Sequence, residues 1–213
     1  MFTGLIEKVC LVRSVQHIAG SMRLVIDMGE IASECDIGDS IAVNGVCLTI
    51  SKLEGNFASF DVSAETIERA SLDKLNSSSK VNIERAMKAN DRFGGHFVLG
   101  HIDGTAKIQA IEKRGEFVNM KFSAGSELLD MMVLKGSVSL DGISLTLANI
   151  DKEGFSVAVI PQTLKKTTLN NAKIGDCVNV ETDIIIKAVK KQLDKILPKN
   201  EPLSAEKLRE LGF

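Results

Sequence analysis

The sequence predicts a mainly β protein that contains the same antiparallel domain twice, followed by a C-terminal helix. Two observations carry this prediction: short alternating runs recur between turn residues, and the chain aligns with itself at a shift of 97 residues. At that shift Asn44–Ile50 falls on Asp141–Leu147. Three shorter blocks align in the same register: Ser40-Ile41 with Ser137-Val138, Glu65–Ile67 with Gln162–Leu164, and Val81–Glu84 with Val178–Glu181. This period exceeds that of a solenoid unit, so two whole domains are expected.

The chain length fits two domains and a tail. A shift of 96 residues aligns a further block, Gly4–Glu7 with Gly100–Asp103, so one residue was inserted or lost between the blocks. Two copies of roughly 90 residues, each large enough for its own core, fit within 213 residues. The predicted divisions are a first domain at 1–90, a linker at 91–96, a second domain at 97–184 and a helical tail at 185–213.

Six strands are predicted in the first copy, because each run alternates apolar and polar residues. They are Lys8–Val15, Met22–Asp27, Ser40–Val43, Val46–Lys52, Phe57–Val62 and Lys80–Glu84. Asn44-Gly45 and Asp141-Gly142 each lie between two such runs and favour the two-residue turn of a β-hairpin. Six strands with little helix favour a six-stranded antiparallel Greek-key barrel, which closes its own edges. Periodicity alone does not distinguish a barrel from a sandwich.

Helical patterns are confined to short insertions and to the tail. Glu65–Leu72 and Gln162–Leu169 favour a helical turn before the last strand of each copy. In the tail, apolar residues follow helical spacing up to Pro198, and a second short helix is expected from Ser204 to Gly212. The tail stripe consists of Ile185, Val189, Leu193, Ile196 and Leu197. It either folds back on the barrels or packs against the same helix of other subunits, and the spacing leaves both open.

Composition excludes several classes of protein. With 44% hydrophobic residues, 25% charged residues and a net charge of −2, the chain lacks the basic excess needed for nucleic acid or anionic membranes. No transmembrane run or signal peptide is recognised, so a cytoplasmic protein is expected. The four cysteines form no C-x-x-C pair, so neither a disulfide framework nor a metal site is expected.

Five motifs in order resemble the riboflavin synthases of the two-barrel type. They are Met1–Glu7, Gly94-Gly95-His96, Gly100–Ile102, Asp141–Thr146 and Ile160–Leu164. The resemblance implies a transferase that needs no cofactor and performs the last step of riboflavin biosynthesis. Two molecules of 6,7-dimethyl-8-ribityllumazine would exchange a four-carbon unit, giving riboflavin and 5-amino-6-(D-ribitylamino)uracil. It also implies a homotrimer assembled through the tail, with each site between neighbouring subunits, and lumazine synthase as a possible partner.

Such a reaction requires deprotonation at the 7-methyl group, protonation of a leaving nitrogen and two ligands held face to face. Two copies of one pocket suit two copies of one substrate. The copies differ at the acid–base positions: the second has His101, Asp141 and Ser144 where the first has Leu5, Asn44 and Cys47. The two pockets are therefore expected to bind alike and to react differently.

The resemblance also implies the site residues. Catalytic roles fall on Ser144, Asp141, His101, Cys47 and Ser40. Substrate contacts fall on Phe2, Gly4, Leu5, Ile6, Cys47, Leu48, Thr49, Asp61, Val62, Ser63, Ala64, Glu65, Thr66, Gly100, His101, Ile102, Lys135, Ser144, Leu145, Thr146, Ile160, Pro161, Gln162, Thr163, Leu164 and Lys165. Ser144, Asp141, His101 and Thr146 are expected to line the reacting end of the second barrel, with Lys135 near the ligand. Phe2, Ser40, Cys47 and Thr49 would face them from a neighbouring first barrel.

Several of these residues also have purely structural explanations. A free cysteine such as Cys47 is usually a small buried hydrophobic residue. Asp141 is explained by its place before a turn glycine, and His101 could be a structural histidine. His96 is expected to shape the link between the barrels rather than to bind a ligand. Gln162 stands where many relatives carry glutamate, which argues against an essential acid there.

The main rival function is a non-catalytic lumazine- or flavin-binding protein of the same family, such as a fluorescent antenna protein. Such proteins lose reactive residues, whereas His101, Asp141, Ser144 and Lys135 are present here. A flavin-dependent oxidoreductase is a more distant alternative, and the chain has no G-x-G-x-x-G motif to support it.

Overall fold

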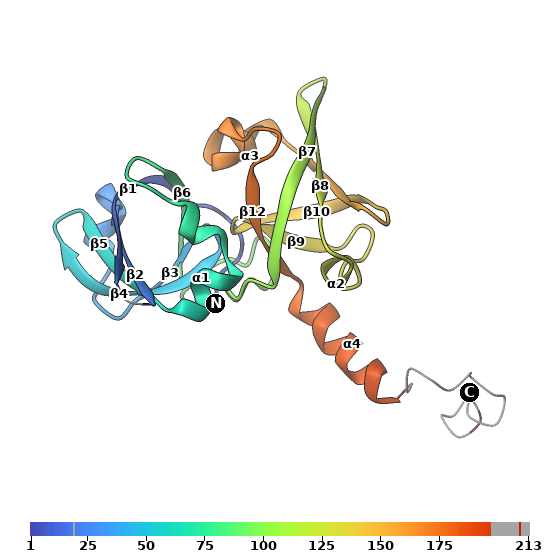
Figure 1. Cartoon of the computed structure of the whole chain (residues 1–213), viewed down its shortest axis with the longest axis horizontal. Coiled ribbons are helices and arrows are strands. Elements are labelled where there is room, and N and C mark those ends of the chain that lie inside the picture. The colour runs from blue at the N-terminus through green and yellow to red at the C-terminus, as the bar shows by residue number, and fades with distance from the viewer. Residues whose placement is uncertain (19, 197–208, 210–213) are drawn as a thin grey trace.

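The computed structural model describes residues 1–18, 20–196 and 209 and shows two six-stranded antiparallel barrels side by side (Figure 1). The first barrel comprises β1 (Lys8–Ile18), β2 (Ser21–Asp27), β3 (Ser40–Val43), β4 (Val46–Glu54), β5 (Phe57–Val62) and β6 (Lys80–Arg85). The second comprises β7 (Gly104–Arg114), β8 (Phe117–Ser123), β9 (Ser137–Leu140), β10 (Ile143–Ile150), β11 (Gly154–Val159) and β12 (Cys177–Thr182). The order is β1-β2-β5-β4-β3-β6 in the first barrel and the equivalent order in the second. Both sheets close, which confirms the duplicated barrels and excludes the sandwich.

Each barrel encloses its own apolar core. In β2, Met22, Leu24 and Ile26 alternate with more exposed residues, because successive side chains of a strand point to opposite faces. In the second barrel Phe122 and Phe155 stack, with ring centroids 5.2 Å apart. Fully burying such a side chain contributes roughly 1.5–3 kcal/mol to stability, so each copy is stabilised by its own apolar core.

The predicted helical insertions are present in both copies. α1 (Ala64–Arg69) begins where the Ser63 hydroxyl accepts a hydrogen bond from the Thr66 backbone N–H, and α3 (Pro161–Lys166) begins at its proline. Proline suits the first turn of a helix because its missing N–H has no partner there. A 3₁₀ turn follows each helix, at Ser71–Lys74 and Thr168–Asn171. Two more short elements, a 3₁₀ turn at Gly29–Glu34 and α2 (Ser126–Leu129), were not predicted.

The tail helix α4 (Ile184–Ile196) projects away from the second barrel (Figure 1). The Lys187 ammonium ties its first turns to Asp103 at 2.8 Å. The stripe residues Ile185, Val189, Leu193 and Ile196 are all about half exposed, so the stripe is not folded back on the barrels. Leu197, the predicted end of the helix at Pro198 and the second helix predicted at 204–212 lie outside the described part of the tail. Among the described helices none is both long and apolar enough to span a membrane.

The two central hairpin turns meet between the barrels. Asn44 and Asp141 both have positive φ angles, 44° and 45°, and so do the glycines that follow them, as the predicted turn type requires. A β-carbon added to Gly45 would lie 2.6 Å from the backbone nitrogen of Gly142, so only glycine fits this contact.

Asparagine side chains bridge these turns in a nearly symmetric pattern. The Asn82 amide donates to the Asp141 carbonyl oxygen at 3.0 Å, and the Asn179 amide donates to the Asn44 carbonyl oxygen at 2.9 Å. In return, the Asn44 and Asp141 side chains accept the backbone N–H groups of Asn82 and Asn179, both at 2.8 Å. The junction between the barrels is therefore polar, buried and paired at each of these groups.

The segments before the two barrels cross over. We call residues 1–7 and 97–103 the exchanged segments. They pair with each other through two backbone hydrogen bonds between Phe2 and Val98, of 2.8 and 3.2 Å. The Gly4 carbonyl oxygen accepts the Ser144 N–H of the second barrel at 2.8 Å, and the Gly100 carbonyl oxygen accepts the Cys47 N–H of the first at 2.9 Å. Each segment thus lies against the barrel of the other copy.

Two buried carboxylates hold the exchanged segments in place. Glu84 accepts the backbone N–H groups of Thr3 and Gly4 at 2.6 and 2.9 Å, together with the Thr3 hydroxyl. Glu181 accepts the N–H groups of Leu99 and Gly100 at 2.7 and 2.9 Å. Buried charges need such partners, because an unpaired carboxylate away from water is costly. Each segment is therefore clamped between a carboxylate of one barrel and a strand of the other.

Candidate functional site

The first-barrel cavity is built by both copies. Its volume is about 490 Å³, within the range of small-molecule sites. It is lined by Val46, Cys47, Glu65, Thr66, Arg69, Ala70, Gly100, His101, Ile102 and Asp103. Strand β4 and helix α1 of the first copy supply one wall, and the exchanged segment of the second copy supplies the other. Six of the predicted contact residues therefore meet in one cavity: Cys47, Glu65, Thr66, Gly100, His101 and Ile102.

This arrangement corrects the expected grouping of the acid–base residues. His101 was expected beside Ser144 and Asp141 at one end of the second barrel. Within the chain it lines the cavity of the first barrel with Cys47, because its segment crosses over. A residue of the second copy's sequence therefore lies at the cavity of the first barrel.

Ser144 lies on the second barrel, against the other exchanged segment. Its hydroxyl is 2.7 Å from Nδ1 of His96, and its backbone N–H donates to Gly4. The His96 side chain is buried, which lowers its pKa, while the negative charge of Asp183 opposes that shift. Leu5 is half exposed beside this contact, and Ile6 packs on the core of the second barrel. His96, which was expected to shape the link between the barrels, thus contacts Ser144 directly.

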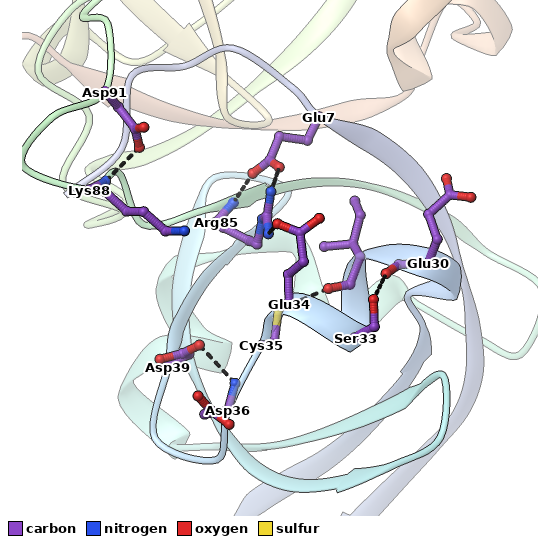
Figure 2. A network of polar contacts seen from close by, with 11 residues as sticks. Glu7, Glu30, Ser33, Glu34, Cys35, Asp36, Asp39, Arg85, Lys88 and Asp91 are labelled. Carbon is purple, nitrogen blue, oxygen red and sulfur yellow. Dashed lines mark hydrogen bonds and ion pairs between the residues drawn. The ribbon is translucent and has the colours of Figure 1, made fainter.

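Ser40 lines a different cavity, of about 540 Å³. Figure 2 shows the ion-pair network beside it, where the Arg85 guanidinium binds Glu7 at 2.7 Å and Glu34 at 2.8 Å. These two carboxylates raise the pKa of Arg85 still further above its ordinary value. The network fixes Glu7, the last residue of the first exchanged segment, onto the first barrel.

Asp141 lies at the junction of the barrels rather than among the lining residues of the first-barrel cavity. It is almost fully buried, and burial raises the pKa of its carboxyl to about 7 despite the hydrogen bond from Asn179. Its equivalent, Asn44, makes the same bond without a charge. A structural role at the junction therefore accounts for its position, and a catalytic role stays a prediction.

We expect Asp141→Asn to make the protein more stable at high pH. A carboxyl whose folded pKa is raised binds a proton that the unfolded chain has lost, so stability falls as pH rises from the unfolded value near 4 to about 7. Asparagine abolishes that loss. In urea unfolding, the gain over wild type should be larger at pH 8 than at pH 5, by roughly 1 kcal/mol or more. The matched exchange Asn44→Asp should introduce the same pH-dependent loss in the first copy; a gain equal at both pH values contradicts this assignment.

The remaining predicted contacts divide by burial. Leu48, Val62 and Leu145 are core residues, and Phe2 is completely buried between the barrels. Thr49, Asp61, Ser63, Ala64, Lys135, Thr146, Ile160 and Gln162 are exposed. Pro161, Leu164 and Lys165 line a cavity of about 380 Å³ beside the β7–β8 hairpin, and Thr163 is partly buried in α3. No group of three or more His, Cys, Asp or Glu side chains suited to a metal ion occurs in the described ranges.

Two features were not predicted from the sequence. One is the pair of carboxylates, Glu84 and Glu181, that hold the exchanged segments and that we call the clamps. The other is the contact of His96 with Ser144. A signal for the clamps was present, since Glu84 and Glu181 end matching blocks of otherwise strand-forming residues in both copies. A charged residue at the same place in two buried strands indicates a fixed partner. The contact of His96 had no comparable signal, because 48 residues separate it from Ser144.

The fold and the first-barrel cavity define a class of proteins: duplicated small-molecule-binding barrels. The "Lumazine binding domain" family matches the chain twice, over residues 3–86 and 99–183. Riboflavin synthase of Bacillus amyloliquefaciens is 41% identical over 215 residues, and that of Actinobacillus pleuropneumoniae is 43% identical over 217, each match covering 100% of both chains. The chain belongs to the riboflavin synthase family.

Solved structures agree on the fold. The crystal structure of LumP with riboflavin superposes with a TM-score of 0.80, covering 85% of this chain and 99% of that chain. The crystal structure of LumP with 6,7-dimethyl-8-(1'-D-ribityl) lumazine gives a TM-score of 0.78 with the same coverage. Sequence identity is 21% in both cases, so this likeness supports the fold alone.

Proposed function

We propose that this protein is a riboflavin synthase, a transferase that converts two molecules of 6,7-dimethyl-8-ribityllumazine into riboflavin and 5-amino-6-(D-ribitylamino)uracil. The observation that carries the proposal is identity of 41–43% with riboflavin synthases along the entire chain. The duplicated barrel supports it, because the reaction consumes two copies of one substrate. Holding both in reacting geometry supplies much of the rate acceleration.

The two barrels bring different groups to their ligands. In the first, Cys47 and His101 border the cavity, and Thr66 and Glu65 offer polar contacts to a ring or ribityl chain. In the second, Ser144 is backed by Gly4 and His96. A ligand on the second barrel would meet a hydroxyl with a hydrogen-bonded partner, and a ligand on the first would meet a thiol and an exposed imidazole. Proton transfer is therefore assigned to Ser144 and His101, and ligand contact to Cys47.

We also propose that the protein works as a homotrimer in the cytoplasm, with each complete site formed by the first barrel of one subunit and the second barrel of a neighbour. The half-exposed apolar stripe of α4 supports assembly through this helix. Truncation after Asp183 should then abolish trimers in sedimentation velocity and lower activity. A truncated chain that sediments as a trimer with full activity contradicts the role of the tail. Lumazine synthase, the possible partner, can be tested in the same experiment by co-sedimentation.

Incubation of the purified protein with the lumazine alone tests the proposed activity. Riboflavin should appear, followed by its fluorescence, with one pyrimidinedione released for each riboflavin. The rival function, a non-catalytic lumazine- or flavin-binding protein, predicts tight binding without turnover. The chain has neither Trp nor Tyr, so a bound lumazine or flavin dominates its near-ultraviolet absorption and binding is easily followed. Binding of substrate at saturation without any product would reject the enzyme.

A further inference from the structure

Each exchanged segment ends in a carboxylate, but the cations that bind these two carboxylates come from different parts of the chain. Glu7 ends the first segment and pairs with Arg85, the last residue of β6, at 2.7 Å. In the second copy Asp103 takes the place of Glu7, at a shift of 96 residues. Thr182 takes the place of Arg85, at a shift of 97. Threonine carries no charge, so the last strand of the second barrel does not supply the cation.

The tail helix supplies it instead. The Lys187 ammonium of α4 lies 2.9 and 2.8 Å from the two oxygens of the Asp103 carboxylate. The same carboxylate accepts the hydroxyl and the backbone N–H of Thr182, both at 2.8 Å. The side chains of the ion pair are only 19% and 18% exposed. Solvent therefore screens this pair less than an ion pair at the surface.

Asp103 connects the ion pair to the first-barrel cavity. It lines that cavity together with His101 and Ile102, its neighbours in the chain. Its backbone N–H donates to the Val180 carbonyl oxygen at 2.9 Å, so both its backbone and its side chain are bound to β12. A residue of the tail helix therefore holds one end of the cavity wall that the second exchanged segment forms.

His101 lies between two anchor points of this segment. On one side, the Glu181 carboxylate accepts two backbone N–H groups of the segment. On the other side, Lys187 holds Asp103. The His101 side chain is exposed, so packing restrains it little. The two anchor points therefore decide where the imidazole lies at the cavity.

The charge of Lys187 reaches the other anchor point as well. Burial raises the pKa of the Glu181 carboxyl, whereas the hydrogen bonds from the segment and the positive charge of Lys187 lower it. Lys187 thus favours the ionised carboxylate, which is purely an acceptor and suits two N–H donors. One ammonium group strengthens both anchor points of the segment.

We propose that Lys187 is a positioning residue for the first-barrel cavity: through Asp103 it fixes the second exchanged segment and so places His101 against the ligand. The inference rests on the proposed function, in which this cavity holds one of the two lumazine molecules. It gives the tail helix a role in the site besides the proposed assembly. The position of α4 is then linked to a cavity of the other barrel, so a displaced tail helix alters the site.

Lys187→Met tests the ion pair, since methionine keeps a flexible, unbranched side chain without the charge. We expect kcat to fall about tenfold, because a misplacement of about 1 Å costs up to about 100-fold in rate. Affinity for riboflavin at one of two sites should fall about threefold. Lys187→Arg keeps the charge and should recover most of both losses. The matched control Lys191→Met removes an exposed lysine one helical turn further along α4 and should change neither.

Two readouts separate positioning from a general loss of structure or of assembly. The chain has three histidines, so NMR of histidine-labelled protein reports on His101 directly. In Lys187→Met the imidazole signal of His101 should move, while that of the exposed His17 on β1 stays in place. Sedimentation should match wild type, because the apolar stripe of α4 is unchanged. An unaltered kcat and His101 signal would overturn the proposal, and loss of the wild-type assembly would do so by making Lys187 an assembly residue.

Asp103→Asn reaches the same contact from the other side and keeps an oxygen that can accept the Thr182 groups. Both variants break one ion pair, so the double variant should be little worse than either single one. Fully additive losses in kcat would show that the two residues act separately and would also overturn the proposal. A wild-type protein that makes no riboflavin rejects the proposed function instead. Riboflavin affinity and the His101 signal then still test the positioning, so the two failures are distinguishable.

Discussion

Replacing Glu181 by methionine is expected to lower the free energy of unfolding by about 2–6 kcal/mol, since one buried and one partly buried N–H group lose their acceptor at roughly 1–3 kcal/mol each. Methionine has a similar volume and no charge, so the change removes the hydrogen bonds rather than the packing. Those N–H groups belong to Leu99 and Gly100. Unfolding in urea measures the loss.

The same variant should damage the cavity of the other barrel. Glu181 belongs to the second barrel, yet it holds Gly100, which lines the first-barrel cavity next to His101. Riboflavin titration should therefore show weaker binding at the first barrel. Glu181→Gln keeps one oxygen acceptor and should recover part of both effects. Since burial raises the pKa of Glu181, the neutral amide also avoids the cost of a buried charge.

Glu84→Met is the matched experiment in the other direction. It releases Thr3 and Gly4 and should disturb the second barrel at Ser144, leaving the first-barrel cavity in place. Glu153→Gln, at an exposed turn, is the surface control. If each variant impairs only its own barrel, the clamps do not act across the junction.

Gly100→Ala should be among the most damaging small substitutions in the chain. Gly100 has a φ angle of +81°, and an added β-carbon would meet the Cys47 side chain and lie 2.7 Å from the Cys47 backbone nitrogen. Positive φ costs an alanine roughly 1–2 kcal/mol. The contact with backbone adds more, because the strand that carries Cys47 is held on both sides and cannot give way. We expect a total loss of about 4 kcal/mol or more, which is exceptional for one methyl group.

A matched glycine separates the two effects. Gly20 has nearly the same φ angle, +80°, and no atom of the described residues that it could meet lies within 4 Å of its added β-carbon. Gly20→Ala should therefore show the conformational cost alone. Gly4→Ala, whose β-carbon would lie 2.6 Å from that of Ser144, should resemble Gly100→Ala. If thermal or urea unfolding ranks Gly100→Ala with Gly20→Ala, the close approach of the exchanged segment is not rigid.

The fold could be predicted from local patterns because its decisive signals are local. Alternating apolar and polar residues indicated the strands, and Asn44-Gly45 and Asp141-Gly142 indicated the turns. Because the chain contains two copies, each of these patterns occurs twice. Barrel closure could not be predicted from periodicity, since it depends on the pairing of β1 with β6 in the first barrel and of β7 with β12 in the second.

The site was predicted only in part, because its geometry depends on where the exchanged segments lie. The motifs pointed to Cys47, His101 and Ser144, and His101 was expected at the second barrel, whereas it lines the first-barrel cavity together with Cys47. Backbone contacts such as Gly100 to Cys47 decide that assignment. Nothing in a linear pattern states which of two similar barrels a segment will cover.

The crossing of the two segments also bears on how the copies could diverge after duplication. Position 101 belongs to the second copy's sequence, but a substitution there alters the pocket whose strands belong to the first copy. A change at Leu5 acts in the opposite sense, beside Ser144. The first-barrel pocket is therefore built from both copies, so that a mutation in either copy alters it. Across descendants of the duplication, substitutions at 101 should covary with those at 47, and substitutions at 5 with those at 144.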